Sequence, residues 1–403
     1  MRFRLFGVRD IVAMLIVIAM GAATGVFFHS HGTERMFVAD IAAVKACQGE
    51  KNQVICSSPF VRHILTYETV SETMDSIAKE LPGIQCHFEG HVVGQQLYMK
   101  SGSVESALEQ CNRQCDSSCV HGVIGEAFAE ELGYGNPTES KDVDLSHLSK
   151  AQIIKLGGAL CGSLETCHGV GHVIFQAEKN IGAGMALCDS FASREDRIVP
   201  CYNGVTMEYS DILTSKNVRN TSDIVPPPAS SLRSLCLFSS IDKRHACFRY
   251  LGRYAVATLL SLGYSESDAL TKIRLICESF PPGDDRVSCM TGIGMYENSS
   301  TITNPSEARR VCDASEKLQD KAACVLGEVF TGAAYREKTL AEYCSSFKNE
   351  VLEQSCYQDL FHYLFIAHGD MGAARGLCVA GNVACTTGLG NYKLDSRAEI
   401  LKL

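Results

Sequence analysis

The fold of this chain is decided by a repeated unit, of which one copy reads Ala269-Leu-Thr-Lys-Ile-Arg-Leu-Ile-Cys277-Glu-Ser-Phe-Pro-Pro-Gly-Asp-Asp-Arg-Val-Ser-Cys289-Met-Thr-Gly292. Apolar residues at helical spacing lead to Cys277, a turn-forming Pro-Pro-Gly-Asp stretch follows, and Cys289 begins a second apolar segment. This pattern predicts a helix, a turn and a second helix, with a disulfide joining the two helices beside the turn. Closing a loop of about 12 residues stabilises such a hairpin by roughly 3 kcal/mol in the chain-entropy model.

Paired cysteines with similar spacing recur along the chain. The pairs are Cys188/Cys201, Cys236/Cys247, Cys277/Cys289, Cys312/Cys324, Cys344/Cys356 and Cys378/Cys385. From Cys277 onward they return about every 29–42 residues, a period typical of helix-hairpin repeats. We therefore expect an all-α fold, a disulfide-stapled helix-hairpin repeat array similar to an α-solenoid. Its histidine-containing repeats span residues 40–180 and its cysteine-paired repeats span residues 181–392.

A glycine follows the second cysteine of most pairs after three or four residues. Copies of this pattern are Cys119-Val-His-Gly122, Cys167-His-Gly-Val-Gly171, Cys201-Tyr-Asn-Gly204, Cys289-Met-Thr-Gly292, Cys324-Val-Leu-Gly327 and Cys385-Thr-Thr-Gly388. Residues three or four apart share a helix face, and a glycine on that face lets a neighbouring helix approach closely.

The repeats carry a resemblance to a known family. Segments such as Arg310-Val-Cys312 to Ala323-Cys324-Val-Leu-Gly327 resemble the disulfide-linked Sel1-like repeats of secreted cysteine-rich proteins, which are relatives of tetratricopeptide repeats. The resemblance covers Cys188 to Gly388. It implies an α-solenoid with a concave binding face, and no catalytic residues carry over from it.

The cysteine content and the N-terminus both predict export. The chain has 20 cysteines in 403 residues, an even number that suits disulfides in an oxidising compartment. Three arginines in residues 1–10 precede an uncharged apolar stretch, residues 11–28, which is just long enough to cross a bilayer as a helix. We expect a single-pass signal-anchor with a cytoplasmic N-terminus and the bulk of the chain in a periplasmic, extracellular or lumenal space. A cleavable signal peptide is the alternative, because Gly21-Ala22-Ala23 offers small residues to a signal peptidase.

The charge of the chain excludes one class of partner. The formal net charge is −9, and the first ten residues contribute +2, so the exported part is near −11. A nucleic-acid-binding protein needs a basic stripe to meet phosphates, and this chain has none. The expected partners are therefore the membrane, through the N-terminal helix, and a protein or peptide.

Two upstream repeats share the pattern Cys-His-x-x-Gly-His, at residues 86–91 and 167–172. In each, the two histidines are four residues apart and lie on one helix face, where two imidazoles can chelate Zn, Cu, Ni or Fe. Later repeats keep the cysteine but replace the histidines, so repeat packing alone does not require them. The candidate metal ligands are His87, His91, His121, His168 and His172.

Three interpretations of these histidines stay open: a polar seam between stacked helices, a transition-metal site, and acid–base catalysis. The two motifs lie 81 residues apart, about two repeats, so they need not share one ion. Glu89, Glu126 and Glu178 are candidate carboxylate ligands.

Three kinds of site are disfavoured by the spacing of their residues: a zinc-protease site, an attached haem and a thiol-exchange site. His87-Phe-Glu-Gly-His91 has its glutamate at the third position, whereas the zinc-protease motif His-Glu-x-x-His has it at the second. The chain also lacks Cys-x-x-Cys-His and Cys-x-x-Cys, so attached haem and thioredoxin-like thiol exchange have no motif to support them.

The remaining cysteines are also expected in disulfides. Cys47/Cys56 and Cys161/Cys167 are natural local partners. Cys86 and the trio Cys111, Cys115 and Cys119 leave three possible pairings, among them Cys86–Cys115 with Cys111–Cys119. A helix disfavours an eight-residue bridge within itself, so that pairing requires a helix break between Cys111 and Cys119.

The sequence favours a binding or scaffold function. The leading hypothesis is a membrane-anchored, exported α-helical repeat protein that presents a concave surface to a protein or peptide. The alternative is a transition-metal-dependent enzyme or metal carrier, with Zn, Cu or Fe held by the two Cys-His-x-x-Gly-His motifs. Because no complete catalytic constellation is present, a non-enzymatic role is favoured and no catalytic residue is named.

Overall fold

The computed structural model describes residues 36–393 apart from internal stretches, of which 133–144, 215–227 and 302–309 are the longest. The elements of this described part are all helices, which confirms the all-α fold. None of the helices described is both long enough and apolar enough for a bilayer crossing. The predicted anchor at residues 11–28 lies outside the described residues.

The helices form two sets that alternate along most of the chain. The first set comprises α2 (Gln53–Ile64), α3 (Val70–Glu80), α5 (Val104–Leu108), α7 (Lys150–Leu160), α9 (Ile181–Phe191), α12 (Glu266–Glu278) and α16 (Glu337–Ser345). The second set, mostly longer, comprises α4 (Ile84–Ser101), α6 (Gln114–Glu131), α8 (Leu164–Glu178), α10 (Glu195–Thr214), α11 (Ile241–Ser261), α13 (Asp284–Thr301), α15 (Leu318–Gly332), α17 (Glu350–His368) and α18 (Val383–Asn391). Two short 3-10 helices, η1 (Leu145–His147) and η3 (Ala374–Leu377), lie in the connections.

The unit around Cys277 shows how the local sequence produces a hairpin. Helix α12 is capped by the Ser265 side chain, which accepts a hydrogen bond from the Asp268 amide. The helix ends at Glu278, before two prolines, and Gly283 takes a φ of 140° in the turn. Helix α13 then begins at Asp284, with two aspartates in its first turn. The predicted helix, turn and helix are confirmed here.

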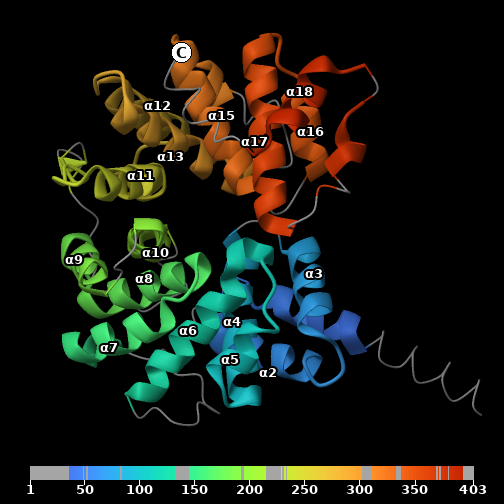
Figure 1. Cartoon of the computed structure of the whole chain (residues 1–403), viewed down its shortest axis with the longest axis vertical. Coiled ribbons are helices and arrows are strands. Elements are labelled where there is room, and N and C mark those ends of the chain that lie inside the picture. The colour runs from blue at the N-terminus through green and yellow to red at the C-terminus, as the bar shows by residue number, and fades with distance from the viewer. Residues whose placement is uncertain are drawn as a thin grey trace, which may run out of the picture.

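Each helix of the second set packs against the next one along the chain, from α4 through α18. In Figure 1 the first part of this succession, α4 to α10, fills the lower half of the molecule, and α11 to α18 fill the upper half. The shorter helices of the first set pack beside their own partners, as α9 does on α10 and α12 on α13.

Glycines allow these helix contacts to be close. A Cβ atom on Gly122 of α6 would collide with the His91 carbonyl of α4, and one on Gly204 of α10 would collide with the His168 carbonyl of α8. Gly327 of α15 meets the Thr291 carbonyl of α13 in the same way. The predicted role of the glycine after each cysteine is therefore confirmed at these contacts, where any larger residue would push two backbones apart.

Every cysteine is in a disulfide. The six predicted pairs are present as Cys188–Cys201, Cys236–Cys247, Cys277–Cys289, Cys312–Cys324, Cys344–Cys356 and Cys378–Cys385. The local pairs Cys47–Cys56 and Cys161–Cys167 are present as well.

Two disulfides hold the first turns of α6. Cys86–Cys115 joins α4 to α6, and Cys111–Cys119 joins the preceding loop to α6. Helix α5 ends at Leu108 and α6 begins at Gln114, so the required helix break is present. Cys115 has a left-handed φ of 51°, an unusual conformation for a residue other than glycine.

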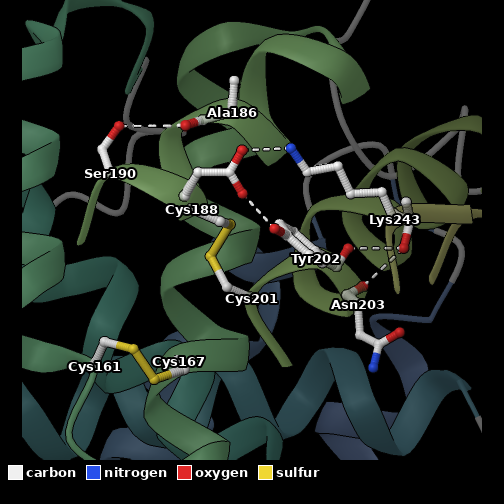
Figure 2. The surroundings of a disulfide bond; sticks show 11 residues. Cys161, Cys167, Ala186, Cys188, Ser190, Cys201, Tyr202, Asn203 and Lys243 are labelled. Carbon is white, nitrogen blue, oxygen red and sulfur yellow. Dashed lines mark hydrogen bonds and ion pairs between the residues drawn. A yellow bond between two sulfur atoms is a disulfide. The ribbon is translucent and has the colours of Figure 1, made fainter. Parts of the chain in front are cut away.

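Figure 2 shows how one disulfide is surrounded by polar contacts between hairpins. Cys188 of α9 is bonded to Cys201 of α10. The residues that follow these cysteines, Asp189 and Tyr202, contact each other. Asp189 accepts a hydrogen bond from the Tyr202 hydroxyl and pairs with Lys243 Nζ of α11 at 2.5 Å. The disulfide and these contacts tie α9, α10 and α11 together.

Two apolar clusters meet at α6. Val123 and Ala127 belong to the cluster that α2, α3 and α4 share. Val120, Ile124 and Phe128 belong to the larger cluster that extends through the helices after α6. Helix α6 is therefore fixed between α4 and α8, and the contacts between these three helices position the site described next.

Candidate metal centre

Five histidines from three successive helices converge in the described structure. His87 and His91 lie on α4, His121 on α6, and His168 and His172 on α8. Neighbouring rings have centroids between 4.7 and 6.1 Å apart. The two Cys-His-x-x-Gly-His motifs therefore do meet, although 81 residues separate them in the chain. His121, between them in sequence, lies between them in space.

Four of the rings, those of His87, His91, His121 and His172, surround one point. All six centroid separations among them fall between 4.7 and 6.1 Å. A metal held about 2.0–2.1 Å from four imidazole nitrogens in tetrahedral geometry places the ring centroids about 5.2 Å apart. The observed arrangement is within about 1 Å of that shell.

The ligand nitrogens are also close to the positions that a metal requires. The Nε2 atoms of His87 and His91 lie 3.1 Å apart, and about 3.3 Å separates two ligand nitrogens in a tetrahedral shell. Nitrogen atoms of the buried trio His87, His121 and His172 lie within 4.8 Å of one another.

Hydrogen bonds orient two of the rings. The Nδ1 atom of His87 lies 2.9 Å from the Cys115 carbonyl oxygen, which can only accept, so Nδ1 donates and Nε2 keeps its lone pair. The Nδ1 atom of His172 lies 2.6 Å from Oε2 of Glu208. This carboxylate–histidine pair orients the ring and fixes its tautomer, as in many metal sites.

Within the histidine cluster, two buried ring nitrogens have no hydrogen-bond partner: Nε2 of His172 and Nδ1 of His121. A buried polar atom without a partner carries a desolvation penalty of about 1–3 kcal/mol. Both atoms belong to the four rings that surround the common point. A bound metal ion would satisfy them.

Burial keeps the imidazoles of His87, His121 and His168 in the neutral form that binds metals. The pKa of His87 is lowered to about 3, first by burial and then by the nearby His172. The pKa values of His121 and His168 are lowered well below the ordinary value, again mainly by burial and next by His172. These rings are uncharged near neutral pH, so a metal does not have to displace protons from them.

Glu208 is a site residue that the sequence reasoning missed. It comes from α10, beyond the histidine-containing repeats, and Gln176 of α8 donates a hydrogen bond to its Oε1 atom at 2.8 Å. Nearby on α10, Asp211 forms a buried ion pair with Arg253 at 3.1 Å. One sequence signal was available, because Glu208 follows Cys201 by seven residues as Glu126 follows Cys119.

The three predicted carboxylate ligands are not among the residues whose ligand atoms gather with the buried histidines. Glu89 is buried but accepts hydrogen bonds from Gln48 and Gln53, and Glu178 pairs with Lys150 at 3.9 Å. Glu126 is buried beside Glu130. The pKa of Glu126 is raised mainly by burial, and secondly by the charge of Glu130. Their proposed role as ligands is therefore wrong for this arrangement of side chains.

A second cluster of ligand-type atoms, Cys312, Cys324 and Glu328, has a different chemistry. The two sulfur atoms form a disulfide, so neither is a thiolate. Thiolates are the form in which cysteine binds metals, and this cluster offers none while the disulfide is intact.

Comparisons with known proteins add no relative. No protein-family model matches the chain, and no curated protein or solved structure is similar to it. The resemblance to Sel1-like repeats therefore stays a prediction, and the function rests on the geometry of the site.

Proposed function

We propose that the protein binds a first-row transition-metal ion in a four-histidine centre formed by His87, His91, His121 and His172. The observation that carries this proposal is the set of six ring separations, all close to the tetrahedral value. Neutral rings, two unpartnered buried nitrogens and the Glu208 carboxylate on His172 support it.

The ligand set favours binding over hydrolytic catalysis. Catalytic zinc sites have three protein ligands and keep the fourth position open for water or substrate. Four imidazoles fill a tetrahedral shell and leave no such position. A structural, storage or carrier role therefore fits this centre better than a hydrolase.

All-nitrogen ligation suits Zn²⁺ and Cu²⁺ best among the candidate ions. Imidazole is a preferred ligand of Zn, Cu, Fe and Ni, and affinity along the first-row divalent series is highest at Cu²⁺. Four neutral ligands leave the charge of the ion uncompensated, and Glu208 supplies one negative charge beside the shell.

The test is metal content after purification of the full chain with its disulfides intact. We expect one transition-metal ion per chain by elemental analysis, and its loss in His121→Gln and His172→Gln. His63→Gln is the matched control, because His63 is exposed and pairs with Asp40 away from the centre. Replacement by Co²⁺ should give the intense visible absorption of a tetrahedral site. Metal-free wild-type protein that takes up no ion would contradict the proposal.

We further propose that the hairpins form a continuous repeat array in an oxidising compartment outside the cytosol. The succession of packed helices from α4 to α18 and the ten disulfides support this. The N-terminal anchor belongs to the same proposal. Protease protection of the chain in sealed membranes, before and after permeabilisation, tests the placement.

A binding module is the second candidate function. It is favoured by exposed apolar side chains at the end of α11 and on α12, where Leu262 and Leu275 are each more than half exposed. Crosslinking in the native membrane should capture a protein partner. The double variant Leu262→Asp, Leu275→Asp should abolish that capture without changing metal content.

A further inference from the structure

His168 has a place in the histidine cluster that the four-histidine shell does not explain. Its ring centroid lies 4.9 Å from those of both His121 and His172, and within the described residues it makes no ring contact with His87 or His91. It is thus outside the shell, yet beside two of its members. His121, His168 and His172 form a second triangle of rings, with sides of 4.7 to 4.9 Å.

His168 is also nearer to solvent than the core of the shell. His87, His121 and His172 are buried, whereas His168 is partly exposed, as is His91 of the shell. It lies where α8 meets α10, and its ring is held by a hydrogen bond to the Pro200 backbone. An ion that approaches from this side meets His168 before it reaches the buried rings.

The surrounding charges make the outer position weaker than the inner one. Burial, His172 and His87 lower the pKa of His168, and the next cause is the positive charge of Arg249. Arg249 lies on α11 with its guanidinium over the Phe330 ring. A positive charge, that of Arg253, also acts on His87 of the inner position, but the inner position has in addition the Glu208 carboxylate beside His172. The outer position has no carboxylate among the described groups that act on His168, so a cation is held less strongly there than at the inner position.

We propose that His168 is a loading ligand, which receives the metal ion from solvent and passes it to the four-histidine shell by sharing His121 and His172 with it. This role rests on the proposed metal centre. A residue that binds the ion only while the ion enters or leaves the shell changes the rates of loading and release by the same factor. It leaves the equilibrium affinity unchanged.

The experiment compares affinity and rate in the full-length, disulfide-intact chain, with Zn²⁺ as the probe. His168→Gln keeps a donor for the Pro200 backbone but removes the imidazole. We expect one Zn²⁺ per chain and wild-type affinity in competition with a chromogenic chelator. Loading of the metal-free protein, followed by stopped flow, should slow by about tenfold or more.

Three variants separate this role from the alternatives. His121→Gln should lose stoichiometric binding, because it removes a member of the shell. His63→Gln should change neither affinity nor rate. Arg249→Gln should speed loading when His168 is present and have no effect in the His168→Gln background.

Two results would overturn the role of His168. One is a loss of affinity in His168→Gln as large as that in His121→Gln, which would make His168 a member of the shell. The other is an unchanged loading rate in a variant with the wild-type circular dichroism spectrum and melting temperature, which would make it structural. If the unaltered chain binds no Zn²⁺, the metal centre itself is wrong, and that outcome is recognised before any variant is made.

Discussion

Glu208 holds His172 from a helix outside the three that carry the histidines. Its carboxylate accepts from Nδ1 of His172 and from Gln176, and both the histidine and the glutamate are almost fully buried. In the proposed centre the carboxylate would have two roles: it directs Nε2 of His172 to the metal position, and it supplies negative charge beside the ion.

Glu208→Gln should therefore lower the metal affinity by about 10–100-fold, the usual effect of losing such an outer-shell partner. The amide oxygen still accepts one hydrogen bond, so the fold is retained while the charge is lost. Competition with a chelator of known affinity measures the change. Glu178→Gln is the matched control, since Glu178 pairs with Lys150 of α7 and not with a histidine in the described structure. Equal affinities for the two variants would show that the charge of Glu208 does not act on the ion.

Glu126 predicts a pH dependence that is independent of the metal. Burial, and then the charge of Glu130, raise the pKa of Glu126 from 4.5 to about 7. Between pH 4.5 and about 7, Glu126 holds its proton more tightly in the folded chain than in the unfolded chain. The free energy of unfolding therefore falls as the pH rises through this range. Glu126→Gln removes the titration, and at pH 8 it should stabilise the protein by about 3 kcal/mol relative to wild type.

Urea unfolding at pH 4.5 and at pH 8 tests this expectation. The two proteins should be equally stable at the lower pH and differ at the higher one. Glu130→Gln removes the neighbouring charge but leaves Glu126 buried, so it should reduce the pH dependence only in part. Parallel pH profiles for wild type and Glu126→Gln would refute the assignment.

At the scale of the helices, the close contact between α4 and α6 keeps the proposed ligands in register. Gly122 lies against the His91 carbonyl, one residue after the proposed ligand His121. Gly125 is on the same helix, but a Cβ there would meet nothing within 4 Å. The two glycines therefore form a matched pair for testing the contact.

Gly122→Ala should destabilise the protein by about 1–3 kcal/mol, because the new Cβ forces two backbones apart. It should also weaken metal binding, since α4 and α6 carry three of the four ligands. Gly125→Ala should be neutral or stabilising, by about 0.5–1 kcal/mol, because alanine restricts the unfolded chain and favours the helix. Thermal unfolding and metal titration of both variants check this, and similar behaviour of the two would contradict it.

At the scale of the whole molecule, disulfides in different places have different consequences for the site. Cys344–Cys356 joins α16 to α17, far along the chain from the histidines. Cys86–Cys115 joins α4 to α6, and the Cys115 carbonyl accepts the hydrogen bond from His87. Both close loops in the unfolded chain, but of these two only the second is joined to a residue that holds a proposed ligand, His87.

Replacing either pair with serines should lower the free energy of unfolding by about 3 kcal/mol. Only the Cys86→Ser, Cys115→Ser variant should also lose metal affinity, because His87 is then no longer held. Elemental analysis and denaturant unfolding of the two double variants measure both effects. Full loss of metal in the Cys344→Ser, Cys356→Ser variant would instead mean that the metal centre depends on the distant hairpins.

Much of the fold was predictable because its signals are local. The cysteine spacing, the Pro-Pro-Gly turn after Cys277 and the glycines after each second cysteine all act within one hairpin. The pairing of Cys86 was not predictable in this way, since its partner Cys115 lies in another hairpin and three pairings were open. The choice depended on the packing of α4 against α6.

For this protein, the sequence alone determined the all-α hairpins, eight of the local disulfides and the five histidine positions, because each of these depends on residues close together in the chain. Only the tertiary structure decided that both histidine motifs meet, that His168 lies outside the shell and that Glu208 is the carboxylate beside it. The physical reason is that these relations depend on how α4, α6, α8 and α10 pack against one another. Helix spacing within one segment cannot specify the angle or register between segments.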